Sequence, residues 1–437
     1  MSRFVGILGI AAILGICWVL SNNRKAVRWR TVAWGMGLQL AFAVLILKTT
    51  PGRWLFDFAR DAVTRILSFT DIGAAFLFGN LYRGTPEIAK SLPPGEVSGH
   101  IQVVDGTTGG FVNLGVIVAI HIIPTIIFFS SLMSVLYHLG IMQRLVRGMA
   151  WIMQRTMKTS GSETLSSAAN VFVGMTEAPL VVKPFVDSMT KSELMAVMVG
   201  GFATVAGGVM AAYVRFGIDP GHLLTASVMS APAALVLAKI VLPETEESNT
   251  AGTLKLKIEK DSVNIIDAAA AGALTGLRLA ANVAAVLLAF VGLVALVDFL
   301  LLKASAPLAG SIPALEGLSL SKIFGWAFSP LAWLIGVPWG DVRTVGSLIG
   351  TKVAVNEFLA YIDLSAAKET MSTKGYIIAT YALCGFANFG SIAIQIGGIG
   401  GISPKRRHDL ARFGFKAMII GALDSALTAA LVGLLIG

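Results

Sequence analysis

Long apolar stretches, separated by short polar segments, make up most of this chain. The clearest of them cover residues 4–21, 31–48, 112–138 and 282–302. A helix needs about 20 predominantly apolar residues to cross a hydrocarbon core about 30 Å thick, and each stretch is at least close to that length. Hydrophobic residues form 55% of the chain and charged residues 14%, too much apolar surface for one water-soluble core. The pattern therefore predicts an all-α, polytopic membrane protein.

Three segments interrupt this pattern. Residues 51–69 place apolar side chains at helical spacing with charges on the opposite face, which predicts a helix lying along the membrane interface. A polar loop follows, and a second polar segment further on predicts a cytoplasmic linker. We expect four parts: N-terminal spans with the interfacial helix (1–110), a first repeat (111–242), the linker (243–262) and a second repeat (263–437).

The two repeats share one order of features. Each begins with an apolar helix around an Ala-Trp pair, continues through two short apolar arms with an acid between them, and ends in a span interrupted by small and polar residues. The acid is Glu177 in "AANVFVGMTEAPL" and Glu357 in "TKVAVNEFLAY". Arms of about ten residues are too short to cross a bilayer. Each pair therefore predicts a re-entrant helical hairpin, at about 164–190 and 340–370.

The distribution of charge predicts the orientation. A formal net charge of +9 is compatible with a nucleic-acid partner, but Lys and Arg cluster beside the predicted spans, at 24–30, 144–158 and 405–416. Such clusters mark cytoplasmic loops. We therefore expect no nucleic-acid partner, and both termini on the extracytoplasmic side of the cell inner (plasma) membrane. The two hairpins then open to opposite sides, which makes the repeats inverted, as in many secondary transporters.

Glu177 and Glu357 are the candidate functional residues. An ionised carboxylate costs about 3 kcal/mol inside a membrane, so an intramembrane acid indicates function. The alternative is that each acid lies in an interfacial loop or pairs with a base such as Lys183. No Ser/His pair, metal cluster or phosphate loop accompanies them in the sequence, which argues against an enzyme. Carboxylates beside Asn and Ser suit a neutral, sugar-like ligand with several hydroxyl groups.

The interrupted spans contain "FATVAGGV" at 202–209 and "FANFGSIA" at 386–393. Small residues in a membrane helix often mark close packing between helices. Alternatively, an unwound backbone frees carbonyl groups that, together with Asn170 and Thr204, replace the water shell of a small cation. The neutral, oxygen-rich set favours a bound cation over coupling to protons alone.

The longest motifs resemble the concentrative nucleoside transporter family, whose members are ion-coupled symporters of nucleosides. They are "SSAANVFVGMTEAPLVVKPF", "VNEFLAY", "LCGFANFGSIAIQIGG" and "SPKRRHDLARFG", and the resemblance runs over essentially the whole chain. It is to the prokaryotic type with eight transmembrane helices. The resemblance implies two re-entrant hairpins in inverted repeats, a scaffold that forms a homotrimer, and a transport domain that imports the substrate by an elevator-type movement.

The resemblance also implies roles for individual residues. The nucleoside would be bound by the hairpin tips, by the second interrupted span and by apolar positions beside the base: Met175, Thr176, Glu177, Val209, Leu279, Glu357, Phe386, Asn388 and Ser391. Of these, Glu357, Asn388 and Ser391 would hold the ribose. A sodium ion would be bound by the side chains of Asn170 and Thr204 and by the carbonyl groups of Val173 and Val205.

Met175 departs from the family pattern, because many members have Gln at this position. Met offers a soft, polarizable surface and no amide to bond the edge of a base, which predicts a preference for purine nucleosides over uridine and cytidine. Two other interpretations stay open. One is a proton-coupled carrier of nucleosides or a related polar solute, and the other is an intramembrane enzyme or channel that uses Glu177 and Glu357 as an acid/base pair or ion ring.

Overall fold

The structure of the protein is a computed structural model that describes residues 2–83, 103–104, 111–112, 117–251, 262–310 and 312–436. Within these ranges the protein is helical, apart from two short strands, β1 (Val103–Val104) and β2 (Phe111–Val112), which pair antiparallel with Val103 opposite Val112. Most of the polar loop at 83–110 and residues 252–261 of the expected linker lie outside the described residues.

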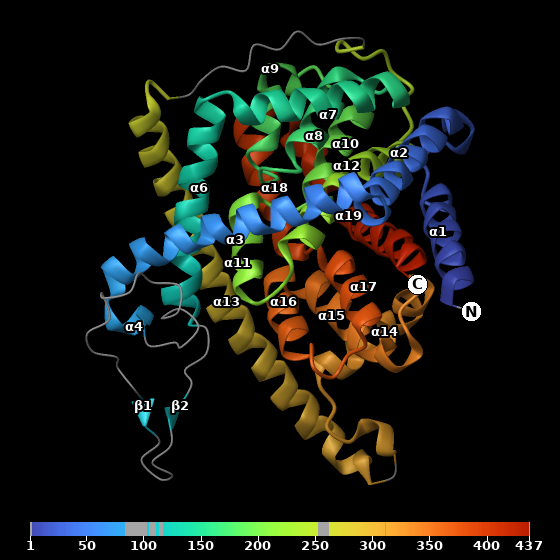
Figure 1. Cartoon of the computed structure of the whole chain (residues 1–437). Helices are drawn as coiled ribbons and strands as arrows, with labels where there is room; N and C mark the ends of the chain where they lie inside the picture. The colour runs from blue at the N-terminus through green and yellow to red at the C-terminus, as the bar shows by residue number, and fades with distance from the viewer. Residues whose placement is uncertain are drawn as a thin grey trace.

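The first half of the chain contains these α-helices: α1 (Ser2–Val19), α2 (Trp29–Lys48), α3 (Thr50–Phe78), α4 (Asn80–Arg83), α6 (Ile123–His138), α7 (Ile141–Met157), α8 (Gly161–Ala169), α9 (Lys183–Val186), α10 (Lys191–Ala203), α11 (Gly207–Arg215) and α12 (Pro220–Val241). The second half contains α13 (Ile265–Ala309), α14 (Leu320–Leu334), α15 (Val342–Ala354), α16 (Glu357–Ala366), α17 (Thr373–Leu383), α18 (Phe389–Ile402) and α19 (Arg407–Leu435). Short helical turns adjoin them, η1 (Arg24–Ala26), η2 (Val118–Ile122), η3 (Ala178–Val182), η4 (Pro313–Leu315), η5 (Trp339–Asp341) and η6 (Pro404–Arg406). Figure 1 shows their arrangement.

Among the described residues, six segments are long and apolar enough to cross a membrane: α2, η2 with α6, α10 with α11, α12, α13, and η6 with α19. The apolar helices α1 and α18 are shorter pieces of the same kind, and α17 directly precedes α18 in the chain. Together they account for the spans that the sequence predicts, so the prediction of an all-α membrane fold is confirmed.

The segment around Trp151 differs from its prediction. Instead of an apolar helix, α7 is amphipathic: Met142, Val146 and Met153 are buried, while Arg144 and Arg155 are exposed. The apolar residues recur every three or four positions, which places them along one face of the helix. The prediction of an apolar helix is therefore wrong here, because basic residues are interspersed among the apolar ones on both sides of the Ala-Trp pair.

The predicted interfacial segment at 51–69 belongs to a longer helix, α3, which crosses the front of the molecule in Figure 1. Thr49 caps its start by accepting a hydrogen bond from the Gly52 amide at 3.1 Å. With Pro51 in the first turn, the helix begins where the chain leaves α2.

The two short-armed segments fold as helical hairpins. In the first, α8 leads through a turn at 170–177 to η3 and α9; in the second, α15 and α16 are separated only by Val355 and Asn356. The return arm of the first hairpin is a 3-10 turn followed by a single α-helical turn, not one continuous α-helix. Pro179 and Pro184 explain this, because proline supplies no amide donor for a regular helix.

The hairpins lie apart in the molecule, with α8 and α9 in the upper part of Figure 1 and α15 and α16 below its middle. The predicted basic clusters gather at the end where the first hairpin lies. There Lys416 donates to the Asn22 side chain at 2.6 Å, and the Thr31 hydroxyl donates to the Met157 carbonyl at 3.1 Å. The chain termini lie close together at the right of Figure 1, and α1 packs against α19.

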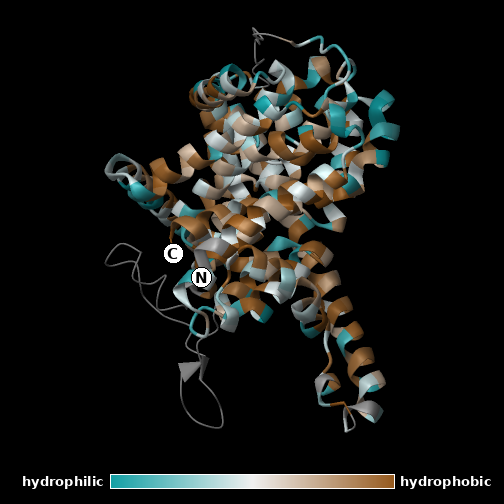
Figure 2. Ribbon diagram, turned by 90° about the vertical axis from the view of Figure 1, so that its right-hand side faces the viewer, coloured by the Kyte–Doolittle hydropathy of each residue, from teal (hydrophilic) through white to brown (hydrophobic). Residues whose placement is uncertain are grey.

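The helices differ greatly in burial. The share of the most apolar stretch that is buried is 89% in α10 with α11, 83% in α12 and 78% in α19, but only 6% in α13. The exposed residues of α13 include Leu288, Val291 and Phe299. This long helix extends from the body of the protein (Figure 1), and Figure 2 shows that the extended part is largely hydrophobic. The core is therefore built on α10, α12 and α19, and α1 and α2 pack against the last two of these.

The closest approach that positions the second hairpin is between α14 and α15. A Cβ added at Gly346 would lie 2.9 Å from both the Gly325 carbonyl oxygen and the Ser329 nitrogen. The two helix backbones are in contact there, so only glycine fits without a shift.

We expect Gly346→Ala to destabilise the protein by about 1–3 kcal/mol, the usual cost of overpacking. Gly340→Ala is the matched control, since an added Cβ meets nothing within 4 Å at that position. The measurement is the thermal unfolding midpoint of the purified protein in detergent. Equal midpoints for the two variants would contradict the close packing of α14 on α15.

Candidate functional site

Glu357 is the centre of the best-defined polar arrangement in the core. Its carboxylate is buried and accepts two hydrogen bonds, from the Tyr213 hydroxyl at 3.0 Å and from the Asn388 amide at 3.0 Å. Tyr213 comes from α11 and Asn388 from the start of α18, while Glu357 itself lies at the tip of the second hairpin. Three segments that are far apart in sequence therefore meet at one carboxylate.

The local sequence explains how Glu357 and Asn388 reach this place. Asn356 caps α16 by accepting from the Leu359 amide at 2.9 Å, and Asn388 caps α18 in the same way by accepting from the Ser391 amide at 2.9 Å. Each asparagine starts a half-helix inside the protein. The positive ends of two helix dipoles therefore lie at the site, where they favour a carboxylate or the oxygens of a ligand.

The break between α17 and α18 depends on Gly385, whose φ is +134°. A side chain there would be strained, and an added Cβ would lie 2.7 Å from the Phe202 carbonyl oxygen. Phe386 follows it and is nearly buried. This glycine lets the chain stop one helix and present Asn388 before the next one begins.

Tyr213 is held in position by other aromatic rings. Its ring lies 4.3 Å from that of Tyr361 and 5.9 Å from that of Phe358, measured between centroids. Both partners belong to α16, the helix that Glu357 begins. The tyrosine and the glutamate are therefore oriented by the same short helix.

Further along α18, Ser391 and Gln395 lie one helical turn apart and both are buried. The Gln395 amide nitrogen donates to the Met198 carbonyl at 2.9 Å, while its oxygen has no hydrogen-bond partner. The polar face of α18 thus continues from Asn388 past Ser391 to an amide with an unused acceptor.

The tip of the first hairpin packs on these elements. Thr176 lies against Gly398 of α18, and Met175 lies against Gly201 of α10, beside Gln395. Glu177 is only half-buried, and its carboxylate folds back over Gly174. Met175, Thr176 and Glu177 therefore lie along one edge of the surface formed by α10, α11 and α18.

Glu177 and Glu357 are not joined directly. The Glu357 carboxylate is bonded to Tyr213 and Asn388, whereas the Glu177 carboxylate forms no hydrogen bond or ion pair with the described residues. Lys183 forms no ion pair with either acid in this part of the chain. The two carboxylates therefore occupy separate positions and do not form an acid/base pair in contact.

The predicted cation-binding residues converge from two sides. Asn170 is fully buried, and neither atom of its side-chain amide has a hydrogen-bond partner. A Cβ placed at Gly200 would lie 3.2 Å from its amide nitrogen, and the Thr204 hydroxyl bonds to the Gly200 carbonyl at 3.0 Å. Asn170, at the end of α8, and Thr204, at the end of α10, therefore both lie beside Gly200.

The backbone carbonyls of this set lie in the two non-helical breaks. The Gly207 amide donates to the Phe172 carbonyl at 3.2 Å, which joins the hairpin turn to the break between α10 and α11. In the described chain, the carbonyl groups of Val173 and Val205 accept no hydrogen bond. The unpaired, buried Asn170 amide and the two unpaired carbonyl groups are together a set of oxygen donors that fits a sodium ion.

The apolar candidates lie at the border of this region. Val209 is buried in the first turn of α11, and Leu279 is partly buried on α13. Gly208 and Gly276 both pack against Ser130 of α6, so α11 and α13 approach the same part of that helix. Val209 directly follows Gly208, and Leu279 lies three residues after Gly276.

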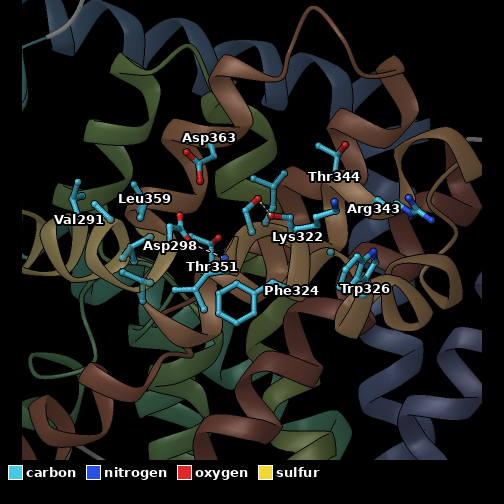
Figure 3. A pocket seen from close by; sticks show the side chains of 18 residues that line it. Val291, Asp298, Lys322, Phe324, Trp326, Arg343, Thr344, Thr351, Leu359 and Asp363 are labelled. Carbon is cyan, nitrogen blue, oxygen red and sulfur yellow. Dashed lines mark hydrogen bonds between the residues drawn. The ribbon is translucent and has the colours of Figure 1, made fainter. Parts of the chain in front are cut away.

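A cavity of about 660 Å³ lies elsewhere, between α13, α14 and the outer side of the second hairpin. Figure 3 shows Asp298, Lys322 and Arg343 around it, together with Thr351 and Asp363. None of the candidate binding residues lines it. We assign the functional site to the polar arrangement around Glu357, because its side chains are positioned by several elements.

Sequence reasoning missed Tyr213 and Gln395. A signal existed for Gln395, which is a polar residue one turn after Ser391 in an otherwise apolar helix. Tyr213 had none, because a tyrosine in a membrane helix is usually a packing residue and its bond to Glu357 joins residues 144 positions apart.

Broken helices that meet inside an all-α membrane protein, with polar groups at their ends, define a secondary transporter. Three family models match the chain: "Na+ dependent nucleoside transporter N-terminus" matches 8–81, "Nucleoside recognition" 119–219 and "Na+ dependent nucleoside transporter C-terminus" 222–433. The chain belongs to this family, the concentrative nucleoside transporters. It is a transporter and not an enzyme, and its family uses sodium as the coupling ion.

Individual relatives agree with this assignment. An uncharacterized transporter of Haemophilus influenzae is 43% identical and covers 100% of this chain and 99% of its own length. The Sodium/nucleoside cotransporter 1 of Rattus norvegicus is 39% identical over 99% of this chain, which spans 64% of the rat protein.

Solved structures show the same fold. A structure of CNTnw in an inward-facing, substrate-bound state is 40% identical, with a TM-score of 0.86 over 99% of this chain and 98% of that one. A variant of CNTnw in an outward-facing state is 39% identical, with a TM-score of 0.88 over 100% of this chain and 98% of that one.

Tyr213→Phe should raise the KM for the transported substrate about tenfold or more, because a hydrogen bond to a charged group contributes about 1.5–3 kcal/mol. Tyr361→Phe is the matched control, since the Tyr361 hydroxyl donates to the Thr380 carbonyl and not to Glu357. The measurement is initial uptake against substrate concentration in proteoliposomes. An equal rise in KM for both variants would show that the hydrogen bond between Tyr213 and Glu357 has no specific role in substrate binding.

Proposed function

We propose that the protein is a sodium-coupled symporter that imports nucleosides. The observation that carries this proposal is the position of Glu357, which is oriented by Tyr213 and Asn388 at the start of a half-helix. A carboxylate fixed in this way can accept from two neighbouring hydroxyl groups, which is the chemistry of a ribose. Family membership supplies the ligand class.

The residues divide the nucleoside into two parts. Glu357, Asn388 and Ser391 form the polar side and receive the ribose. Met175 and Thr176 at the first hairpin tip, with Phe386, Val209 and Leu279, receive the base. Glu177 has a carboxylate that is not engaged with the described residues, so it can also accept from a sugar hydroxyl.

Sodium coupling follows from the turn of the first hairpin. Asn170 and Val173, at the start of the turn, belong to the cation set, and Met175 to Glu177, at its end, belong to the substrate set. Eight consecutive residues, 170–177, therefore serve both ligands. A cation held by Asn170, Val173, Thr204 and Val205 would fix this turn against α10, which places the tip for the nucleoside.

We further propose an elevator-type cycle in a homotrimer. Apart from Leu279 of α13, the candidate residues lie on the two hairpins and on or beside α10, α11, α17 and α18, which would move together. The outer helices α6 and α13 pack against each other and form the core of a scaffold, and the exposed apolar side of α13 suits lipid or a second copy of the chain. The basic end would face the cytoplasm, with both termini outside the inner (plasma) membrane.

A preference for purine nucleosides is the finer part of the proposal. Met175 lies on Gly201 with the Gln395 amide close by. The methionine offers contact area and no hydrogen bond, which suits the larger face of a purine. The unused oxygen of Gln395 lies next to this position and would accept from an amino group.

Thr204→Val keeps the side-chain shape and removes one oxygen of the cation set. We expect the sodium concentration for half-maximal uptake to rise about tenfold, with little change at saturating sodium. Thr225→Val is the matched control, because the Thr225 hydroxyl also bonds the carbonyl four residues before it, at 2.7 Å, but lies in α12.

The same assay tests the coupling itself. Replacing sodium by choline at fixed pH should abolish uptake by the wild-type protein. Unchanged uptake in choline would reject sodium coupling and favour the proton-coupled alternative.

Met175→Gln should restore an amide that can bond the edge of a pyrimidine. We expect uridine to compete with labelled adenosine about tenfold more effectively in this variant than in the wild type, in which inosine should compete better than uridine. The measurement is the concentration of unlabelled nucleoside that halves uptake. Equal competition by uridine and inosine in the wild type would reject the purine preference.

A further inference from the structure

Asp424 is a second buried acid that the proposed nucleoside and sodium sites do not use. It lies in the buried part of α19, its side chain is fully buried, and neither carboxylate oxygen has a hydrogen-bond partner. An ionised carboxylate without donors is among the most costly groups inside a membrane. Its presence therefore calls for a positive charge that the protein side chains do not supply.

The groups around Asp424 are oxygens. Thr428 lies one turn further along α19 on the same face, and its hydroxyl accepts from the Gln39 amide of α2 at 3.0 Å. The Gln39 oxygen is fully buried and has no partner. Ser230 of α12 faces the Asp424 carboxylate, and its hydroxyl lies 3.4 Å from that of Thr428. Three helices thus direct oxygen atoms at one buried region.

The nearest base does not neutralise Asp424. Lys352 of α15 is buried and donates to the Ala382 carbonyl at 3.0 Å and to the Ser425 hydroxyl at 2.9 Å. It forms no ion pair with Asp424 within the described chain. Lys352 also interacts with the charge of Glu357. Two acids therefore share one base, which leaves this part of the core one positive charge short.

The other titratable groups that face Asp424 are thiols. Cys17 of α1 interacts with its charge, and Cys384 interacts electrostatically with both Lys352 and Asp424. Both cysteines are buried and free. A thiol supplies no positive charge and only a weak donor, so neither cysteine can replace the missing cation.

We propose that Asp424, with Gln39, Ser230 and Thr428, forms a second monovalent-cation site, separate from the Asn170 set, which takes a sodium ion or a proton. Either occupant neutralises the carboxylate, and both match the shared chemistry of the site: one negative charge, a buried amide oxygen and two hydroxyl groups. The role of this cation in transport rests on the proposed symport function. Because Gln39 comes from α2, the site is complete only while α2 lies against α19.

The test uses the purified full chain and Asp424→Asn, an isosteric and permanently neutral variant. Asp409→Asn is the matched control, because Asp409 lies on the same helix but is paired with Arg406 at 3.1 Å. The first readout is the unfolding midpoint as a function of sodium concentration and of pH, without nucleoside. The second is proteoliposome uptake, with the ratio of ²²Na⁺ to nucleoside flux and the pH profile at saturating sodium.

A sodium occupant predicts that Asp424→Asn loses part of the sodium-dependent stabilisation and transports one sodium ion fewer per nucleoside. A proton occupant predicts that the variant loses the pH dependence that the wild type and Asp409→Asn share. Unchanged sodium response, flux ratio and pH profile in Asp424→Asn would overturn the proposal. Thr428→Val, which removes one oxygen and no charge, should weaken the same response about threefold to tenfold and provides a second test if Asp424→Asn does not fold.

The two readouts separate this site from the proposed function. If the wild type takes up no nucleoside but Asp424→Asn changes the sodium or pH dependence of unfolding, the symport proposal fails and the cation site stands. If the wild type is a sodium-coupled nucleoside symporter and Asp424→Asn matches it in both readouts, the cation site fails alone.

Discussion

The hydrogen bonds that Asn356 and Asn388 make as helix caps are the interactions on which the site depends. Inside a bilayer a broken helix would leave several amide groups without partners, each at a cost of several kcal/mol. A capping side chain satisfies one of these donors at each break and holds the chain where the half-helix begins. These two caps also position Glu357 and Ser391. The same hydrogen bonds that satisfy the broken helices therefore shape the binding surface.

The same constraint acts at the first hairpin in a different way. There the turn at 170–177 is not satisfied by its own side chains: the Asn170 amide and the Val173 carbonyl remain without partners. One break is thus complete within the protein, whereas the other has polar groups left over for an ion. This difference gives a physical basis for coupling, because the incomplete turn also carries Met175, Thr176 and Glu177.

Local sequence patterns were enough to predict much of the fold. The apolar stretches predicted the spans, and the short arms around Glu177 and Glu357 predicted hairpins, because span length and helical reach are set by a few residues at a time. Resemblance to the family supplied the ligand roles. The pattern was misleading at α7, where the basic residues indicate the orientation of the chain but also make the helix amphipathic. It was misleading again in the return arm of the first hairpin, where two prolines shorten the helix.

What the sequence by itself determined is the class of fold, the position of its breaks and the two acids at the hairpin tips, since all of these depend on neighbouring residues. Only the tertiary structure decided that Glu357 is bonded to Tyr213, that the buried side chain of Asn170 has no hydrogen-bond partner among the described residues, and that Asp424 lies among oxygens from α2, α12 and α19. The partners that decide these cases lie far away in sequence, since Tyr213 and Glu357 are 144 positions apart and Gln39 and Thr428 are 389 apart. No local pattern contains that information.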